Sequence, residues 1–152
     1  MSKKTWVEKI IDKKSKWLKA TKLEKEGKLR EAAKEYLEEA KKQESKNIAM
    51  AALSYLSAAK CLMKVGERER AMELFKKAGD KYREYGESII SLTPTSTAWA
   101  YNMASKCYMW AEEYGKAEEL RKMAESISEK IEPKLSDEGV PLFRAFKRKK
   151  RR

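Results

Sequence analysis

Histidine is absent from this sequence of 152 residues, and cysteine (two), proline (three) and side-chain amides (three) are scarce. The missing histidine removes the side chain that most often serves as general base, proton shuttle or metal ligand near neutral pH. Two cysteines outside a CxxC spacing do not supply a zinc ligand set, and no glycine-rich loop is present to cradle phosphate. We therefore expect a protein that is not an enzyme and that binds no cofactor, metal or small-molecule substrate.

Long hydrophobic runs are also missing. No window of 18 residues is apolar, so we expect no transmembrane segment. The first residues, MSKK, lack the apolar core of a signal peptide, and this predicts a cytoplasmic protein. Lysine (27) and glutamate (21) dominate the charged residues while amides are few, a composition typical of proteins from hyperthermophiles.

The net charge of +12 is concentrated at the two ends of the chain. Residues 1–28 have a balance of +6, and residues 144–152, with the sequence RAFKRKKRR, have a balance of +7. The 115 residues between them come to −1. The sequence therefore describes a near-neutral body with two basic ends.

Apolar residues recur at helical spacing along most of the chain, and no segment alternates in the manner of a strand. We therefore predict an all-α fold. Gly86 is a candidate bend or stop, Thr93-Pro94 a helix start, and Pro133 a helix end. We therefore predict a helical domain over 1–132 and a basic tail over 133–152. The predicted helices span about 3–25, 28–44 and 46–64, then one that starts near 67, and finally about 94–113 and 116–131.

The six helices form three pairs, each with a glycine-bearing turn. In the middle pair, Gly66 is followed by Ala71, Phe75 and Ala78, which resembles the second helix of the tetratricopeptide repeat. The longer hairpins are similar to those of soluble NSF attachment proteins. This resemblance implies a right-handed array of three antiparallel hairpins, and a plain antiparallel bundle is the alternative. The other pairs follow more loosely, through Gly27, Ala33, Leu37 and Ala40 and through Gly115, Leu120, Ala124 and Ile127.

Aromatic residues cluster on the fifth predicted helix and cannot all lie on one stripe. We expect most of them in the core and some in the groove of the array, where repeat proteins bind partners. Trp6 and Trp17 share an apolar face of the first helix, which suggests a homodimer as a hypothesis. Cys61 and Cys107 are expected in the core. The cluster consists of Trp99, Tyr101, Tyr108, Trp110 and Tyr114.

The C-terminal segment gives the strongest functional signal, because a run of cations is favourable beside a polyanion, where it releases counterions. We expect an RNA-binding, ribosome-associated factor that bridges or blocks subunits, with ribosomal RNA and ribosomal protein as partners. The alternatives are a membrane-peripheral adaptor on anionic lipid, a general protein–protein scaffold, and a nuclear protein with KRKKRR as import signal. Predicted nucleic-acid contacts are Arg144, Lys147, Arg148, Lys149, Lys150, Arg151 and Arg152, with Lys9, Lys13 and Lys16; predicted partner contacts are Trp6, Trp17, Trp99, Trp110, Phe143 and Phe146.

Overall fold

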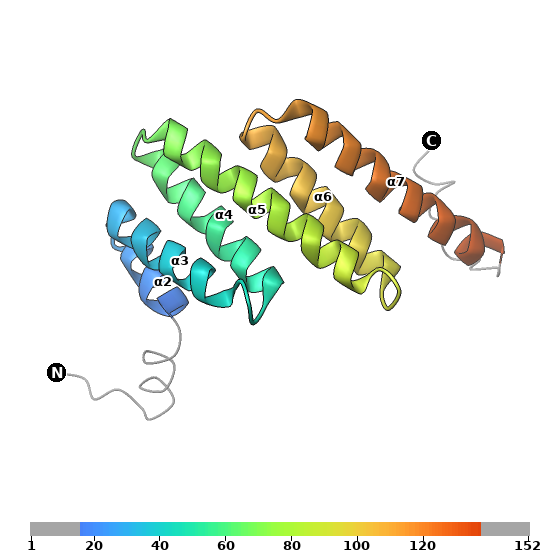
Figure 1. Cartoon of the computed structure of the whole chain (residues 1–152), viewed down its shortest axis with the longest axis horizontal. Coiled ribbons are helices and arrows are strands. Elements are labelled where there is room, and N and C mark those ends of the chain that lie inside the picture. Colours follow the sequence, from blue (N-terminus) through green and yellow to red (C-terminus); the bar gives the residue numbers. More distant parts are fainter. Residues whose placement is uncertain (1–15, 138–152) are drawn as a thin grey trace, which may run out of the picture.

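The computed structural model describes the backbone of residues 16–137 and the side chains of residues 16–131. This part of the chain is helical apart from short turns and contains no strand, as predicted. Six helices follow one another and pair as three hairpins (Figure 1). They are α2 (Lys16–Lys25), α3 (Leu29–Gln43), α4 (Ile48–Lys64), α5 (Arg68–Ile89), α6 (Pro94–Trp110) and α7 (Tyr114–Asp137).

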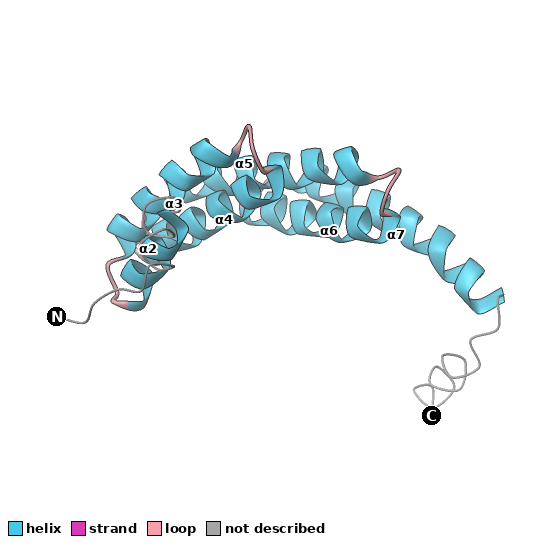
Figure 2. Ribbon diagram, turned by 90° about the horizontal axis from the view of Figure 1, so that it is seen from below, coloured by secondary structure: helices cyan, strands magenta, loops and turns pink. Residues whose placement is uncertain are grey.

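Each helix packs against the next one along the chain, so the hairpins form an elongated array. The array is curved, with α4 and α6 on the concave side and α3 and α5 on the convex side (Figure 2). Small side chains fill much of the core, since eleven alanines of the first five helices are wholly buried. Because alanine has a short side chain, neighbouring helices approach closely along the array. The handedness of the array stays a prediction.

The turn inside each hairpin has the same backbone geometry. Gly27 and Gly66 adopt φ angles of +81° and +84°, and Glu112 takes the equivalent position with φ +59°. After each of them, the next amide donates to the carbonyl five residues back, at 2.8–3.0 Å, as in a Schellman motif. The repeat register of the third hairpin therefore starts from Glu112. Gly115, which the sequence suggested as its turn residue, lies in the first turn of α7.

Helix starts are fixed by different means. The Asn47 side chain accepts a hydrogen bond from the Met50 amide at 3.1 Å and so caps α4. Thr93 stands before Pro94 as predicted, but its hydroxyl makes no cap bond. Instead, its carbonyl accepts the Thr97 amide at 3.0 Å, and Pro94 needs no partner because it lacks an N–H.

Two glycines inside α5 mark a close approach to α6. Gly86 was a predicted bend or stop, but α5 continues through it to Ile89. A Cβ atom at Gly86 would lie 2.7 Å from the Tyr101 ring, and one at Gly79 would lie 2.8 Å from the Tyr108 ring. Glycine is therefore present here to admit two buried tyrosine rings, and not to end the helix.

The end of the last helix also differs from the prediction. Pro133 was expected to close it near residue 131, but α7 runs on to Asp137. A proline within a helix removes one backbone hydrogen bond and crowds the preceding turn, which weakens the helix without always ending it. The boundary predicted between residues 132 and 133 consequently falls inside α7.

The close contact between α5 and α6 predicts how three glycine-to-alanine substitutions differ. Gly79→Ala and Gly86→Ala should lower the free energy of unfolding by up to about 2 kcal/mol, because overpacking costs about 1–3 kcal/mol and alanine regains only about 1 kcal/mol of helix propensity. Gly115→Ala should stabilise by up to about 1 kcal/mol, since nothing lies within 4 Å of its added Cβ. Urea unfolding followed by circular dichroism measures all three. Equal stabilisation at Gly79 and Gly115 would contradict the packing described.

Candidate interaction surface

Charge is distributed unequally between the two helices of each hairpin. The first helices, α2, α4 and α6, carry seven lysines and a single acid, Glu24. The second helices, α3, α5 and α7, carry fifteen basic and fifteen acidic residues. The described helices thus divide into one acid-poor set and one balanced set.

The first helices of the second and third hairpins expose side chains of the same kinds at equivalent positions. Positions are counted back from the turn residues Gly66 and Glu112, so they follow the shared turn geometry. An apolar residue lies thirteen positions back, a lysine six back and a methionine three back, all of them exposed. We call this set, with Trp110, the lysine–apolar face. Its members are Leu53, Lys60 and Met63 of α4 and Trp99, Lys106, Met109 and Trp110 of α6.

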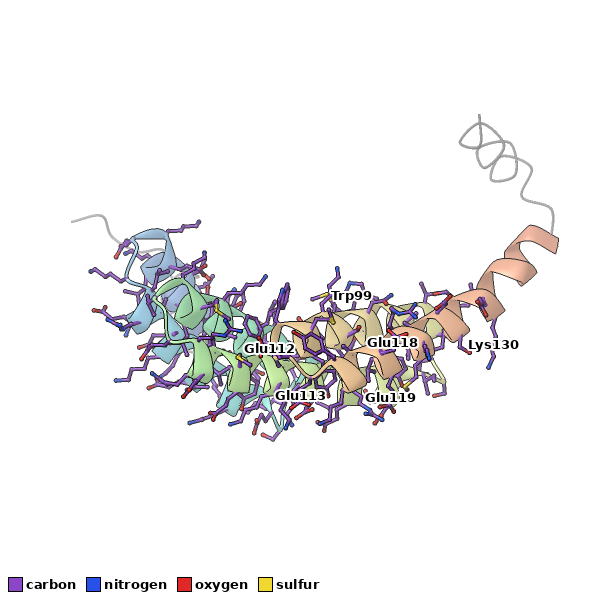
Figure 3. All side chains as sticks on the ribbon, turned by 90° about the horizontal axis from the view of Figure 1, so that it is seen from above. Trp99, Glu112, Glu113, Glu118, Glu119 and Lys130 are labelled. Atoms are coloured by element: carbon purple, nitrogen blue, oxygen red, sulfur yellow. The ribbon has the colours of Figure 1, made fainter. Side chains whose placement is uncertain are left out.

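The aromatic residues of this face are exposed but held in place. Trp99 is 52% exposed and meets the edge of Tyr82 at a ring-centroid distance of 5.9 Å. Trp110 is 43% exposed and packs on Phe75 at 5.3 Å. Lys60 Nζ lies 5.5 Å from the centre of the Trp110 ring, which links α4 to α6. Trp99 projects on the concave side, whereas Glu113 and Glu119 lie toward the convex side (Figure 3).

The aromatic cluster of the fifth predicted helix is divided between core and surface. Tyr101 and Tyr108 are buried, while Trp99, Trp110 and Tyr114 are exposed. The expectation that most of the cluster lies in the core is therefore wrong. The reason is the contact with α5, which takes up only the two rings opposite its glycines.

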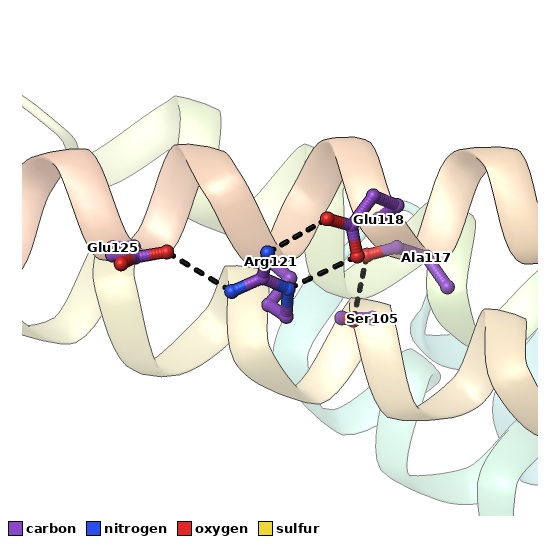
Figure 4. A network of polar contacts seen from close by, with 5 residues as sticks. All are labelled: Ser105, Ala117, Glu118, Arg121 and Glu125. Atoms are coloured by element: carbon purple, nitrogen blue, oxygen red, sulfur yellow. Dashed lines mark hydrogen bonds and ion pairs between the residues drawn. The ribbon is translucent and has the colours of Figure 1, made fainter.

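On the second helices, by contrast, some charges are paired with others on the same helix. Arg121 of α7 bonds Glu118 at 2.7 Å and Glu125 at 3.0 Å, while Ser105 of α6 donates to the Ala117 carbonyl at 2.7 Å (Figure 4). The hydrogen bond from Arg121 lowers the pKa of Glu118. Neither Lys60 nor Lys106 forms an ion pair with any described residue. Their charges are therefore available to a partner.

Two of the predicted end-of-chain contacts can be placed. The ammonium of Lys16 pairs with Glu38, and that hydrogen bond raises its pKa. Trp17 is half-buried and meets the Tyr36 ring edge-on at 4.9 Å. Trp99 and Trp110 lie on the lysine–apolar face. Trp6, Lys9, Lys13, Phe143, Arg144, Phe146, Lys147, Arg148, Lys149, Lys150, Arg151 and Arg152 lie outside the described residues.

Tyrosine hydroxyls inside the array are satisfied by acids of neighbouring helices. The Tyr36 hydroxyl donates to Glu24 at 2.7 Å, and the Tyr108 hydroxyl donates to Asp80 at 2.5 Å. Desolvation by burial, followed by the bond to Glu44, raises the pKa of Tyr55. These tyrosines stay protonated near neutral pH, so they stabilise the packing and offer no base.

Both cysteines lie in the core, as predicted. Burial raises the pKa of Cys61 to about 11 and that of Cys107 to about 12. Because only the thiolate is nucleophilic, neither thiol is reactive at neutral pH. Among residues whose structure is described, no group of three or more His, Cys, Asp or Glu could hold a metal ion.

Thiol reactivity provides a direct test of this burial. At pH 8 the pH lies below the pKa of both thiols, and in the native protein both are buried in the core. Ellman's reagent should therefore label neither within minutes. In guanidinium chloride both should react at once, with the unperturbed reactivity of free cysteine. A native thiol that reacts at the unfolded rate would contradict the position of that cysteine.

A shallow groove of about 370 Å³ lies at the end of the array, where no further hairpin follows α7 among the described residues. Its lining is mainly apolar, from Ile90, Tyr101, Met123 and Ile127, with one cation, Lys122. Over residues 16–137, no helix combines the length and apolarity that crossing a bilayer requires.

Comparisons with known proteins add no relative to this description: no protein-family model, no curated protein and no solved structure matched the chain.

Proposed function

We propose that the protein is a non-enzymatic helical-repeat interaction protein. The array docks a protein partner, and the basic ends bind ribosomal RNA, so that the chain acts as a ribosome-associated factor. The observation that supports docking is the lysine–apolar face, where two exposed tryptophans of α6 lie with lysines of α4 and α6 that form no ion pair among the described residues. Apolar patches of this kind on soluble proteins mark interaction sites.

The relationship to tetratricopeptide-like arrays belongs to this proposal. It is supported by the turn residues Gly27, Gly66 and Glu112, each followed five positions later by a buried alanine. Those alanines are Ala32, Ala71 and Ala117. A repeated small residue at the helix crossing is what lets the two helices of such a hairpin approach closely.

The RNA part of the proposal rests on the sequence of the C-terminal end. Seven cations in residues 144–152, with no acid among them, repel one another unless a polyanion lies beside them. Phe143 and Phe146 accompany these cations, and aromatic rings stack on unpaired bases. Ribosomal RNA offers both phosphates and unpaired bases next to protein surfaces.

Co-sedimentation with ribosomal subunits tests the RNA part. The intact protein should bind at low salt, and the logarithm of its binding constant should fall with that of salt concentration at a slope of about −5 to −6 if all seven cations contact phosphate. A protein ending at Leu142 should lose most of this binding. If truncation leaves binding and slope unchanged, the C-terminal cations do not carry it.

The second candidate, a membrane-peripheral adaptor, depends on the same segment. Leu142, Phe143 and Phe146 beside the cations also suit the interface of an anionic membrane. Flotation with vesicles containing phosphatidylserine separates the two functions. Binding to vesicles but not to subunits would favour the adaptor, and binding to subunits alone would favour RNA. The homodimer remains a hypothesis that light scattering would decide.

A further inference from the structure

The lysine–apolar face carries information about the chemistry of its partner. We propose that it binds an acidic, amphipathic segment of a partner protein, whose carboxylates pair with Lys60 and Lys106 and whose apolar side chains cover Trp99 and Trp110. This inference rests on the proposed docking function and specifies the partner class. It does not depend on the basic ends of the chain.

Charge complementarity is the first argument for an acidic partner. Over α4 and α6 the charged residues are Lys60, Lys64 and Lys106, and no acid is present. Lys64 already faces Glu24 at 3.9 Å, whereas Lys60 and Lys106 have no carboxylate partner among residues 16–131. A basic partner would be repelled by this face, and an acidic one would bring the missing carboxylates.

The apolar residues argue for a protein segment over a nucleic acid. Leu53, Met63 and Met109 are exposed on the same helices as the lysines, and methionine-rich surfaces adapt to the apolar side of helices. Nucleic-acid grooves track the backbone with many cations, but among the described residues this face offers two lysines without an ion pair and no arginine. Two lysines with five apolar side chains match a partner that is itself half apolar and half acidic.

Spacing along the face agrees with a helical partner. The apolar residue and the lysine are seven positions apart on both α4 (Leu53, Lys60) and α6 (Trp99, Lys106). Seven residues of helix span about 10 Å, and two turns return to nearly the same side. A partner helix that carries an apolar residue and an acid seven positions apart therefore matches the pair on α4 and the pair on α6.

The probe for this proposal is a fluorescein-labelled peptide of 18 residues, designed so that leucine occupies one side of a helix and glutamate the other. Fluorescence anisotropy measures its binding to the full chain. Lys60→Glu with Lys106→Glu should weaken binding about tenfold or more, because two attractions become repulsions. Trp99→Ala should weaken it separately. The matched control, Lys41→Glu with Lys130→Glu on α3 and α7, has the same net charge and should change affinity less than threefold.

Every other outcome contradicts the proposal, and the outcomes differ in what they imply. Equal losses in the two double variants would mean that the peptide senses net charge, for example at the C-terminal cations. No loss in either, or no binding, would also reject the face as its site. If a uridine oligonucleotide binds in its stead and is lost in the Lys60/Lys106 variant, or a peptide with lysine in place of glutamate binds and is lost in Trp99→Ala, docking survives but the partner is not acidic protein. Loss of ribosome co-sedimentation alone would affect only the proposed RNA function. Circular dichroism checks that each variant is folded.

Discussion

The packing of two tyrosine rings of α6 onto two glycines of α5 determines which side chains remain at the surface. Gly79 receives Tyr108 and Gly86 receives Tyr101, and both pairs are seven residues apart on antiparallel helices. At about 100° per residue, residues 99, 106 and 110 point roughly 140–180° away from the two tyrosines. The buried contact therefore places Trp99, Lys106 and Trp110 on the side of α6 opposite the two tyrosines. The position of the tyrosines in the core thus determines which residues of α6 are exposed.

The turn geometry explains why these exposed positions recur one hairpin earlier. Gly66 and Glu112 both have positive φ and end α4 and α6 in the same way. Residues at the same number of positions before them therefore occupy equivalent places in the two hairpins. Leu53 then corresponds to Trp99 and Lys60 to Lys106. A side chain in the left-handed region costs energy that glycine avoids, and Glu112 bears this cost while it pairs with Arg68 of the preceding hairpin.

The sequence predicted much of the fold, and its errors have physical causes. The six helices, their pairing and the buried cysteines follow from apolar spacing, which depends on local periodicity alone. Gly86 was misread as a break because a glycine that ends a helix and one that admits a ring look alike in sequence. The register of the third hairpin was misplaced because Glu112, a residue that seldom adopts positive φ, occupies the turn, while Gly115 stands nearby. Alignment on Ala32, Ala71 and Ala117 carries the signal that would have corrected it.

That register error also concealed the candidate site. With the hairpins aligned on Gly115, Lys60 and Lys106 do not correspond, and the net charge of the middle of the chain, close to zero, points to no site. The sum hides two unlike sets of helices: the second helices carry both signs and form pairs such as Arg121 with Glu118, whereas α4 and α6 carry lysines and no acid. Folding does not require unpaired lysines beside exposed tryptophans, and water solvates the lysines in the free protein. The arrangement becomes favourable when a partner brings both carboxylates and apolar surface, because burying the indoles then also strengthens the ion pairs by removing water.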